Sequence, residues 1–562
     1  MLTERFEPTR WLTAAALVAL AVLAAALYLP YLGNPPVFDD RYFFSGQQFA
    51  EHAVFPLGLG LRHPPYFTLA FVHTVWGSME AHRVVSLLLH IGCAWALYAL
   101  LRALQLGRTA AFAGAALFAL HPVAVYGAGY LMQRTIVVAT LFALLALLAF
   151  LRGMRTGRLS DAVPAAVLYS LAVLSKEHAI FLPAAAAALL LLGRTSLYFA
   201  IRYTLLFFAL CAPAAIFVVL RVRGVIGEAY EPHLESIVEQ ISASPGIEAV
   251  TSPWLGSMLV QTAMFFRYLW VWLLPSTADM AIDLRVDFAD YWAPGVALPT
   301  VLCFIALPSL ALFLLLRRSR ASLAAWGFLY VWILFGIEFA AVRFQEPFVL
   351  YRSYLWAPGI AVALAAVLDR LPRRLLVALL VPALALLAWQ ANDRLKTFSS
   401  GLAVWEDAAA KLPQEPVPGG YRPLYEVGRE YLYAGRADDA AEVTERCIRL
   451  YPKLFECAFA RAAIQIEVKQ YEKALPSINY ALGLRPRDGA ARHHLGWVLD
   501  NLGCRKEALA QYRLSAQFGF GPAVYRLQAA ESPGKGLVVP TKLPPQADCT
   551  ALLRRNAIPK PG

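Results

Sequence analysis

The sequence predicts an all-α protein in which a polytopic membrane domain precedes an α-solenoid of helical repeats. Hydrophobic residues make up 59% of the 562 residues and charged residues only 16%, whereas soluble domains carry roughly a quarter charged residues. Long apolar stretches recur as far as residue 395, and the more polar remainder of the chain shows a 34-residue period. The net charge of +12 is spread over short clusters, which does not suit a nucleic-acid-binding face.

About eleven apolar stretches have the length that a membrane helix needs or come close to it. A helix rises about 1.5 Å per residue, so that roughly 20 apolar residues cross a hydrocarbon core of about 30 Å. The first stretch lacks a clear cleavage site and is expected to remain as an anchor. The expected helices lie at residues 11–33, 84–104, 109–121, 135–151, 161–175, 179–193, 203–221, 293–316, 323–341, 355–369 and 374–391.

The segments that join these stretches are of two kinds, and the difference predicts their orientation. Segments rich in arginine are expected in the cytoplasm, following the positive-inside rule. The other segments hold carboxylates, histidines and aromatic residues, and are expected on the periplasmic side of a bacterial inner membrane, as is the C-terminal part. Residues 257–275 would break this alternation if they crossed, so we expect a re-entrant or interfacial helix there. The basic residues are Arg102, Arg108, Arg152, Arg155, Arg158, Arg194, Arg202, Arg317, Arg318, Arg320, Arg370, Arg373 and Arg374.

The 34-residue period predicts tetratricopeptide repeats in the C-terminal part. Gly428, Ala462 and Gly496 share one register, and Pro452 and Pro486 share another. Small residues where helices cross and a closing proline are typical of this repeat. We expect a repeat domain at residues 396–531, after a membrane domain at 1–395 and before an extended tail at 532–562, with repeats at about 421–454, 455–488 and 489–522.

The seven cysteines divide unevenly between these parts. Cys93, Cys211 and Cys303 lie in apolar segments and are expected to act as small buried hydrophobic residues. The other four can form disulfides in an oxidising compartment, but their pairing cannot be deduced from the sequence. These four are Cys447, Cys457, Cys504 and Cys549.

Four external connections carry ionisable groups that a membrane tolerates poorly. Taken singly, each group has an ordinary explanation, as a solvated acidic pair, a charged turn at the membrane surface or a snorkelling or anchoring arginine. Together, carboxylates, cations and aromatics on one side of apolar helices predict a site for an amphiphile with an anionic head. The groups are Asp39 and Asp40 in connection 34–83, then His121 and Arg134, then Lys176 and Glu177, and finally Glu346 and Arg352.

Several motifs in their order along the chain resemble a known family. They are the aspartate pair, LHPVAVYGAGYLMQR (120–134), LSKEHAIFLP (174–183), RYLWVWLLPSTADMAIDL (267–284) and EPFVLYRSYLWAPG (346–359). With the repeats that follow, they are similar to the membrane O-mannosyltransferases with tetratricopeptide repeats and their bacterial relatives. Those proteins belong to the GT-C class of glycosyltransferases. Arg83 departs from the pattern, because a histidine is expected there.

The resemblance implies an inverting glycosyl transfer from a lipid-phosphate-linked sugar, with undecaprenyl as the lipid in a bacterial protein. By position, Asp39 or Asp40 would be the general base that takes a proton from the acceptor hydroxyl. Arg134, Lys176 and Arg352 would bind the phosphate or pyrophosphate and stabilise the negative charge that develops on it.

The resemblance assigns supporting roles to three further residues, because Glu177, His121 and Glu346 would orient these cations or contact the sugar. The concave face of the repeats would bind the acceptor, through residues that the sequence does not identify. A divalent cation is possible, although no spacing of acidic residues requires one. Its oxygen ligands would come from Asp39, Asp40, Asp279, Asp283 and Glu346.

Three functions stay open at this stage. The first is transfer of a sugar or short glycan to a hydroxyl of an exported protein, for example a pilin. The second is transfer to a lipid or a polysaccharide, and the third is a non-catalytic scaffold that assembles an envelope complex through the repeats. A transporter is disfavoured because the sequence shows no inverted repeat.

Overall fold

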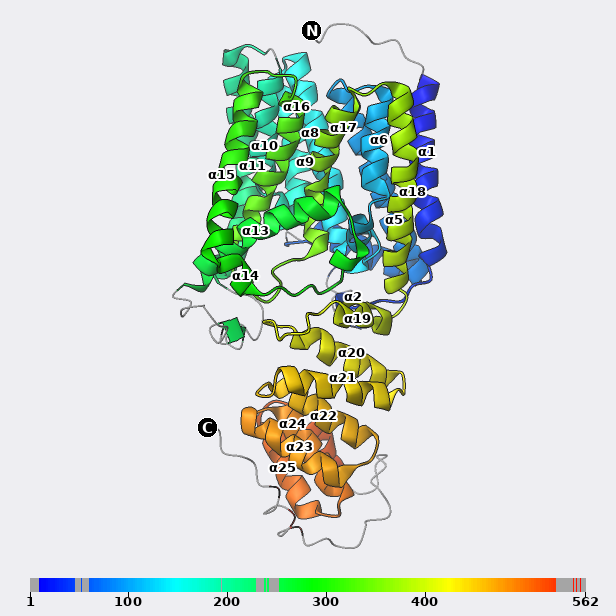
Figure 1. The fold of residues 1–562 in the computed structure, drawn as a ribbon, viewed down its shortest axis with the longest axis vertical. Coiled ribbons are helices and arrows are strands. Elements are labelled where there is room, and N and C mark those ends of the chain that lie inside the picture. The colour runs from blue at the N-terminus through cyan, green and yellow to red at the C-terminus, as the bar shows by residue number, and fades with distance from the viewer. Residues whose placement is uncertain are drawn as a thin grey trace. The chain divides into compact units, whose positions relative to one another are not determined.

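The computed structural model in Figure 1 describes most of the chain and is helical, with one isolated β-bridge between Leu284 and Phe348 in the described part. Much of the predicted first connection between residues 46 and 59, and nearly all of the predicted tail 532–562, lie outside the described residues. The described residues are 10–45, 52, 60–193, 195–228, 237–238, 240–241, 252–531, 549, 552 and 556.

The chain divides into two units, Met1–Asp407 and Ala408–Gly562. The division falls inside α19 (Gly401–Ala410), slightly beyond the expected domain boundary at residue 395.

Within the described residues of the first unit, seven helices are long and apolar enough to cross a membrane. α6 (Arg108–Ala119) bends by 51° into the segment Pro122–Ala128 and would make an eighth span. Shorter apolar helices follow at α9 (Ala162–Ser175), α10 (Leu182–Ala188) and α17 (Ala357–Leu368). Six of the long helices are α1 (Arg10–Tyr28), α5 (Met79–Ala103), α8 (Arg134–Thr156), α11 (Leu197–Val222), α15 (Pro294–Leu316) and α18 (Arg373–Thr397). The seventh is α16 (Ser322–Phe335), which reaches the length of a span together with the helical turn that continues it to Ala340.

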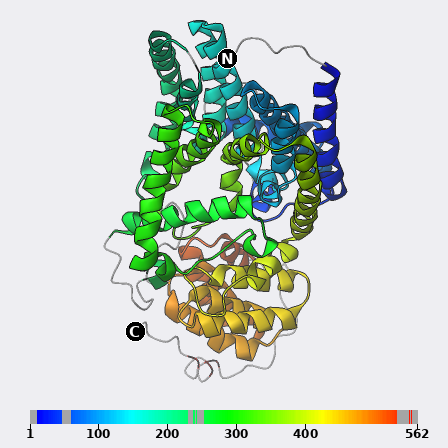
Figure 2. The ribbon, with the colours of Figure 1, turned by 45° about the horizontal axis from the view of Figure 1, so that its top comes forward.

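These helices coincide in position with the eleven predicted apolar stretches, and the prediction of an all-helical, multi-pass membrane protein is confirmed. One helix behaves differently. α13 (Pro253–Leu273) lies across the bundle in both views, not along it (Figure 1, Figure 2). It covers the segment for which the sequence predicts a re-entrant or interfacial helix, and its hydropathy does not place it with the seven long spans.

Close helix packing in this unit depends on small residues, as is typical of membrane helices. α16 and α17 approach one another at Gly327 and Gly359. A Cβ on Gly327 would overlap the Gly359 carbonyl oxygen, and a Cβ on Gly359 would come within 2.7 Å of the Tyr330 ring. This contact fixes α16 and α17 against one another, and the chain that joins these two helices carries the predicted site residues Glu346 and Arg352.

Short elements on the connections complete the first unit. Three of them, α2 (Asp39–Ser45), η5 (Glu177–Ala179) and η10 (Leu350–Leu355), carry predicted site residues. The others include α4 (His63–Val75), η2 (Pro122–Ala124), α7 (Val125–Ala128), η3 (Leu131–Gln133), α14 (Phe288–Trp292) and η9 (Gly336–Ala340).

The second unit consists of helix pairs whose first helices begin at residues 421, 455 and 489, an interval of 34 residues. Small residues recur where the helices cross, since a Cβ on Gly496 would meet the Tyr512 ring at 2.6 Å. The assignment to the tetratricopeptide family stays a prediction. The pairs are α20 (Tyr421–Tyr433) with α21 (Ala437–Leu450), α22 (Phe455–Glu467) with α23 (Tyr471–Leu484), and α24 (Gly489–Asn501) with α25 (Arg505–Gln517), followed by α26 (Gly521–Glu531).

Two disulfides lie in the second unit, which answers the pairing that the sequence leaves open. Cys447 on α21 is bonded to Cys457 on α22, and Cys504, just before α25, is bonded to Cys549. Of the cysteines in the first unit, Cys93 and Cys211 are buried as expected, whereas Cys303 is exposed on α15. The prediction that Cys303 is buried is therefore wrong for this chain by itself, because only 22% of the apolar window of α15 is buried.

Candidate active site

The aspartate pair begins α2, and its two members differ in environment. The Asp40 carboxylate is fully buried, where Oδ1 accepts from the Met132 backbone N–H at 2.7 Å and Oδ2 from the Val37 N–H at 3.4 Å. Burial raises the pKa of Asp40 to about 7, although these hydrogen bonds and Arg83 act against the shift. Asp39 is exposed, and its backbone N–H donates to the Tyr130 hydroxyl oxygen at 3.2 Å.

Arg83 holds the segment before α2 in place. This buried side chain on α5 donates to the carbonyl oxygens of Asn34 at 2.8 Å, Pro35 at 2.8 Å and Gly129 at 2.7 Å. The arginine therefore ties the first connection to the loop that carries Tyr130. The sequence marks Arg83 as a departure from the family pattern, and the structure gives that departure a positioning role.

Two tyrosines link the acidic side of the site to its cationic side. The ring of Tyr130 lies 6.3 Å from that of Tyr351, and the Lys176 ammonium lies 5.7 Å from the centre of the Tyr351 ring. Burial and the neighbouring carboxylates raise the pKa of the Tyr130 hydroxyl well above its ordinary value, so it stays a neutral phenol. The path from Asp39 to Lys176 is thus continuous.

On the cationic side, the fully buried Glu338 of η9 lies against two arginines and a histidine. Its carboxylate lies 3.1 Å from Arg352 Nη1, 3.3 Å from Arg343 Nε and 3.3 Å from His178 Nε2. Arg352 also lies 3.5 Å from the Glu346 carboxylate. We call Glu338, His178, Arg343 and Arg352 the Glu338 cluster, in which two arginines share the central carboxylate.

Lys176 and Glu177 adjoin this cluster, and Glu177 shares a partner with it, because the Glu177 carboxylate lies 3.6 Å from His178 Nδ1. Glu177 accepts two hydrogen bonds from the Arg62 guanidinium, at 2.7 and 3.3 Å, and so joins η5 to the chain entering α4. Lys176 is buried and makes no ion pair with another described residue. Burial, reinforced by Arg62, Arg343 and Arg352, lowers the pKa of Lys176 to about 7.

Two predicted ligands of the head group lie apart from these contacts. Arg134 is fully buried in α8 and donates to Ser86 Oγ at 3.2 Å, Thr68 Oγ1 at 3.4 Å and the His82 carbonyl at 2.6 Å. It therefore cross-links α8 to α4 and α5.

His121 has protein partners at both ring nitrogens. Nδ1 accepts from the Val123 N–H at 3.2 Å, Nε2 lies 3.1 Å from the Trp272 carbonyl oxygen, and the ring stacks on Trp272 at 4.1 Å. Since Nδ1 is an acceptor, the proton is on Nε2. The ring thereby fixes the end of α13 to η2, and its role toward a ligand stays a prediction.

Glu338 and Arg343 are not among the site residues that the sequence predicts. Glu338 lies in the stretch 323–341, which the sequence predicts as a membrane span. A single carboxylate in an apolar helix is costly unless it is paired. The presence of Glu338 in this apolar stretch is therefore the sequence signal that indicates a buried charged site. Its partners could not be predicted, because they come from three separate segments.

An apolar cavity of about 260 Å³ lies between α4, α5, α8 and α9. Its polar lining residues are His63, which follows Arg62 in the chain, and Thr68, whose hydroxyl accepts from Arg134. The rest of the lining is aliphatic or aromatic and includes Phe67, Leu89 and Phe142. The cavity is therefore suited to hydrocarbon.

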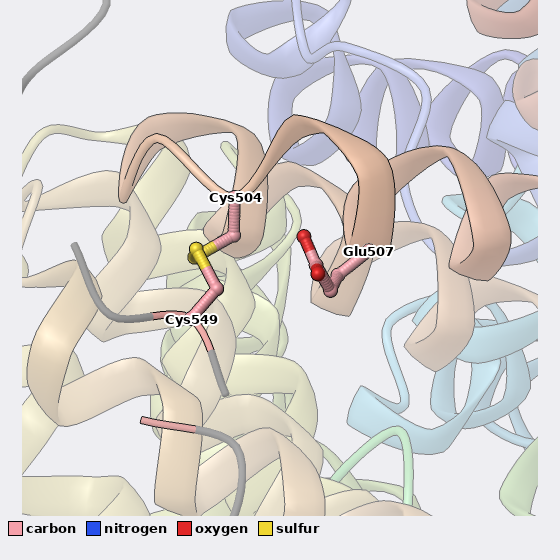
Figure 3. Close-up of side chains that lie close together, drawn as sticks. All are labelled: Cys504, Glu507 and Cys549. Atoms are coloured by element: carbon pink, nitrogen blue, oxygen red, sulfur yellow. A yellow bond between two sulfur atoms is a disulfide. The ribbon is translucent and has the colours of Figure 1, made fainter. Parts of the chain in front are cut away.

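Among the described residues, one group has the spacing of metal ligands, namely Cys504, Glu507 and Cys549 (Figure 3). The two sulfur atoms are bonded to each other and have no thiolate to offer a metal. Of the acidic residues proposed as oxygen ligands, Asp283 pairs with Arg285 at 2.5 Å and Glu346 with Arg352.

Comparison with known proteins bears on part of this site. Residues 62–217 match the family described as dolichyl-phosphate-mannose-protein mannosyltransferase, a segment that contains Arg62, Arg134, Lys176 and Glu177 but not Asp39. No curated protein matches the chain.

Two solved structures are similar to this chain at low identity. One is the Archaeoglobus fulgidus oligosaccharyltransferase tethered through a disulfide to an acceptor peptide containing the NVT sequon, with 14% identity and a TM-score of 0.37 over 75% of this chain and 59% of that chain. The other is the oligosaccharyltransferase AglB from Archaeoglobus fulgidus with an inhibitory peptide and a dolichol-phosphate, with 15% identity and a TM-score of 0.36 over 79% of this chain and 60% of that one.

The chain thus spans about six tenths of the length of these two proteins. The family match lies where the sequence motifs 120–134 and 174–183 were found. The predicted resemblance to the GT-C superfamily of membrane glycosyltransferases is therefore confirmed on the segment from residue 62 to residue 217.

Proposed function

We propose that this protein transfers a sugar or short glycan from an undecaprenyl phosphate or pyrophosphate donor to a Ser or Thr hydroxyl of an exported protein, such as a pilin. The observation that carries the proposal is the continuous path from Asp39 through Tyr130 and Tyr351 to Lys176. It joins the start of α2, where the Asp39 carboxylate is exposed, to a group of cations on connections between apolar helices. The match to the mannosyltransferase family supports the same reaction class.

Asp39 is the better candidate for the general base. A base must reach the acceptor hydroxyl, and Asp39 is exposed whereas Asp40 has both carboxylate oxygens bonded to backbone N–H groups. Asp40 then acts as a positioning residue, because it connects the start of α2 to the segment around Met132. The Tyr130 hydroxyl accepts from the Asp39 backbone N–H and so helps to hold the start of α2 in place.

Transfer then proceeds in one displacement. The acceptor oxygen gives its proton to Asp39 and forms a bond to the anomeric carbon, while the bond from that carbon to the donor phosphate oxygen breaks. The electron pair of the broken bond stays on the lipid phosphate. Lys176, Arg352 and Arg343 are suited to stabilise this growing charge, because each is a buried cation in the same part of the site.

The apolar cavity between α4, α5, α8 and α9 would hold the first hydrocarbon units of the lipid. His63, which lines this cavity, directly follows Arg62 in the chain. Arg62 pairs with Glu177, which is the sequence neighbour of Lys176. A lipid that enters here has its tail in an apolar space and its phosphate near the cations. Arg134 would contribute to this arrangement by keeping α4 packed against α8.

The second unit would lie outside the cytoplasm and present the acceptor. Disulfides persist in oxidising compartments, and this unit contains two. The arginine-rich connections agree with that orientation under the positive-inside rule. Helical repeats expose extended surfaces that suit a protein acceptor better than a small molecule.

The test compares Asp39→Asn with wild type and with Asp290→Asn, a matched change at an exposed carboxylate on α14. Glycan-sized mass adducts are measured on proteins of the cell envelope at equal expression of each variant. We expect Asp39→Asn to lose an adduct from at least one protein and Asp290→Asn to keep it. A proteome that is unchanged by Asp39→Asn, with the deletion phenotype still complemented, would contradict catalysis and favour the scaffold.

The acceptor class needs a separate measurement. Purified protein is given a lipid-linked donor with and without candidate acceptors, and release of the lipid phosphate is followed. Removal of residues 408–562 should abolish protein modification while slow hydrolysis of the donor continues. Undiminished modification of a lipid or polysaccharide by the truncated protein would favour the second function instead.

A further inference from the structure

The second unit contains a cleft of about 560 Å³ between α21, α22 and α23, within the size range of ligand sites. The cleft therefore lies between the second helices of two consecutive pairs and the first helix of the later pair. Ile448 and Ala458 give its lining an apolar part, and Glu445, Arg461, Gln465 and Lys473 give it a polar part.

Two polar atoms of the lining are buried without a hydrogen-bond partner in the described part of the chain. They are Arg461 Nε, a donor, and Gln465 Oε1, an acceptor. They come from positions four residues apart on α22, which face the same side of a helix. Buried polar groups in proteins are almost always satisfied, so this pair indicates a ligand that offers both an acceptor and a donor. The backbone of an extended peptide does so at each residue.

The charge of the cleft indicates the character of that peptide. Arg461 pairs with Glu445 at 2.7 Å, so these two charges compensate one another. Lys473 is exposed and forms no ion pair with a described residue. The cleft thus has a net positive charge and complements an acidic side chain. The chain's own tail fits poorly, because residues 532–562 hold five lysines and arginines and one aspartate.

We infer that the cleft between α21, α22 and α23 binds an extended, acidic segment of the acceptor protein. This deepens the proposed function, on which the identity of the partner rests. Arg461 Nε would donate to a peptide carbonyl, Gln465 Oε1 would accept from a peptide N–H, and Lys473 would pair with a carboxylate. An apolar side chain of the segment would lie against Ile448.

The test measures binding of a short labelled peptide of alternating glutamate and valine to the full-length protein in nanodiscs, by fluorescence anisotropy. Lys473→Glu should raise Kd about tenfold at low salt, and the difference should shrink at high salt. Gln465→Leu should raise Kd about fivefold at any salt concentration, because it removes a hydrogen-bond acceptor and no charge. The matched control is Arg513→Glu, the same charge change at an exposed position on α25 outside the cleft, which should leave Kd unchanged.

Equal binding of a lysine–valine peptide, or a Kd that neither Lys473→Glu nor Gln465→Leu alters, would overturn the inference. Transfer of glycan is measured separately on the same preparations, which separates the two claims. A protein that transfers glycan but does not bind the glutamate peptide retains the proposed function and loses this inference. Binding that follows the variants as expected, without any transfer, supports the cleft and contradicts the enzyme.

Discussion

The regions around Arg134 and Arg352 bury an arginine almost equally, yet they compensate its charge in different ways. Arg134 is 0% exposed and donates to two hydroxyls and a carbonyl, without an ion pair in the described part of the chain. Arg352 is 2% exposed and pairs with the carboxylates of Glu338 and Glu346. Burial alone therefore does not distinguish a structural cation from one that belongs to a charged site.

The groups that each arginine contacts distinguish the structural cation from the cation of a charged site. Arg134 joins three helices through neutral groups and resembles a cross-link. Arg352 belongs to the Glu338 cluster, next to Lys176, where several cations share one buried carboxylate and an anionic ligand would complete the charge balance. If this comparison is right, the two regions should respond differently to the same substitutions.

The largest expected effect is on stability, from Glu338→Ala. This change leaves Arg343 and Arg352 buried without their shared carboxylate, and we expect a loss of about 3–5 kcal/mol in the free energy of unfolding. Thermal unfolding in detergent measures it, with Glu80→Ala as the control at an exposed carboxylate in the first turn of α5. A melting temperature equal to that of the control would show that the cluster is not held together by Glu338.

The second prediction compares turnover in Arg352→Met and Arg134→Met. Methionine keeps much of the side-chain volume and removes the charge. Loss of a group that stabilises developing negative charge costs about a hundredfold in turnover, so Arg352→Met should fall by that factor. Arg134→Met should stay near wild type once the folded fraction is taken into account. Equal losses in the two variants would remove the distinction between the regions.

The third prediction concerns pH and Lys176, where burial and the nearby arginines lower the pKa to about 7. The ammonium is present below that pH and is lost above it, so the affinity for a lipid phosphate should fall as pH rises through 7. The expected change is about tenfold per pH unit above the pKa, since one proton must be bound for each ligand. Glu177 opposes this shift, and its removal should move the fall to lower pH.

Donor binding at pH 6 and pH 8 measures this effect. Lys176→Arg, which keeps its charge, should bind equally at both values, and Lys176→Met should bind weakly at both. Asp40 titrates in the same range, with a pKa of about 7, so the wild-type profile alone is not sufficient. A pH dependence that persists in Lys176→Arg would assign the titration to Asp40.

Much of the first unit was predictable because apolar stretches must be helical in a membrane, where every backbone polar group needs an internal partner. The clustering of Asp39, Lys176 and Arg352 was also predictable, because ionisable groups on one side of the bundle are forced toward one another. The sequence did not predict in the same way which charged residues pair with one another. Glu338 meets residues from η5, the segment before η10 and η10 itself, and the packing of α16 against both α17 and η5 brings these together.

The contacts of His121 and the pairing of the cysteines were unpredictable for the same reason. His121 was expected near the head group because of its position in a motif, but its ring stacks on Trp272, a residue 151 positions away in the sequence. The disulfide partners Cys447 and Cys457 meet because the turn between α21 and α22 brings them close. Local pattern predicts where such residues occur, and packing over long separations determines what they contact.

The smallest expected effect is on stability in Arg134→Met, about 1 kcal/mol, and it tests the comparison most directly. Three hydrogen bonds are lost, but two of their acceptors keep other partners, since Thr68 already donates to the Pro65 carbonyl at 2.7 Å and the His82 carbonyl belongs to α5. The substitution also removes a buried cation that forms no ion pair with a described carboxylate, which offsets part of the loss. Unfolding in detergent, with Arg108→Met as the exposed control on α6, measures the difference. If Arg134→Met unfolds as readily as Glu338→Ala, Arg134 is compensated by a charge after all, and Asp40, which interacts electrostatically with it, is the carboxylate to substitute next.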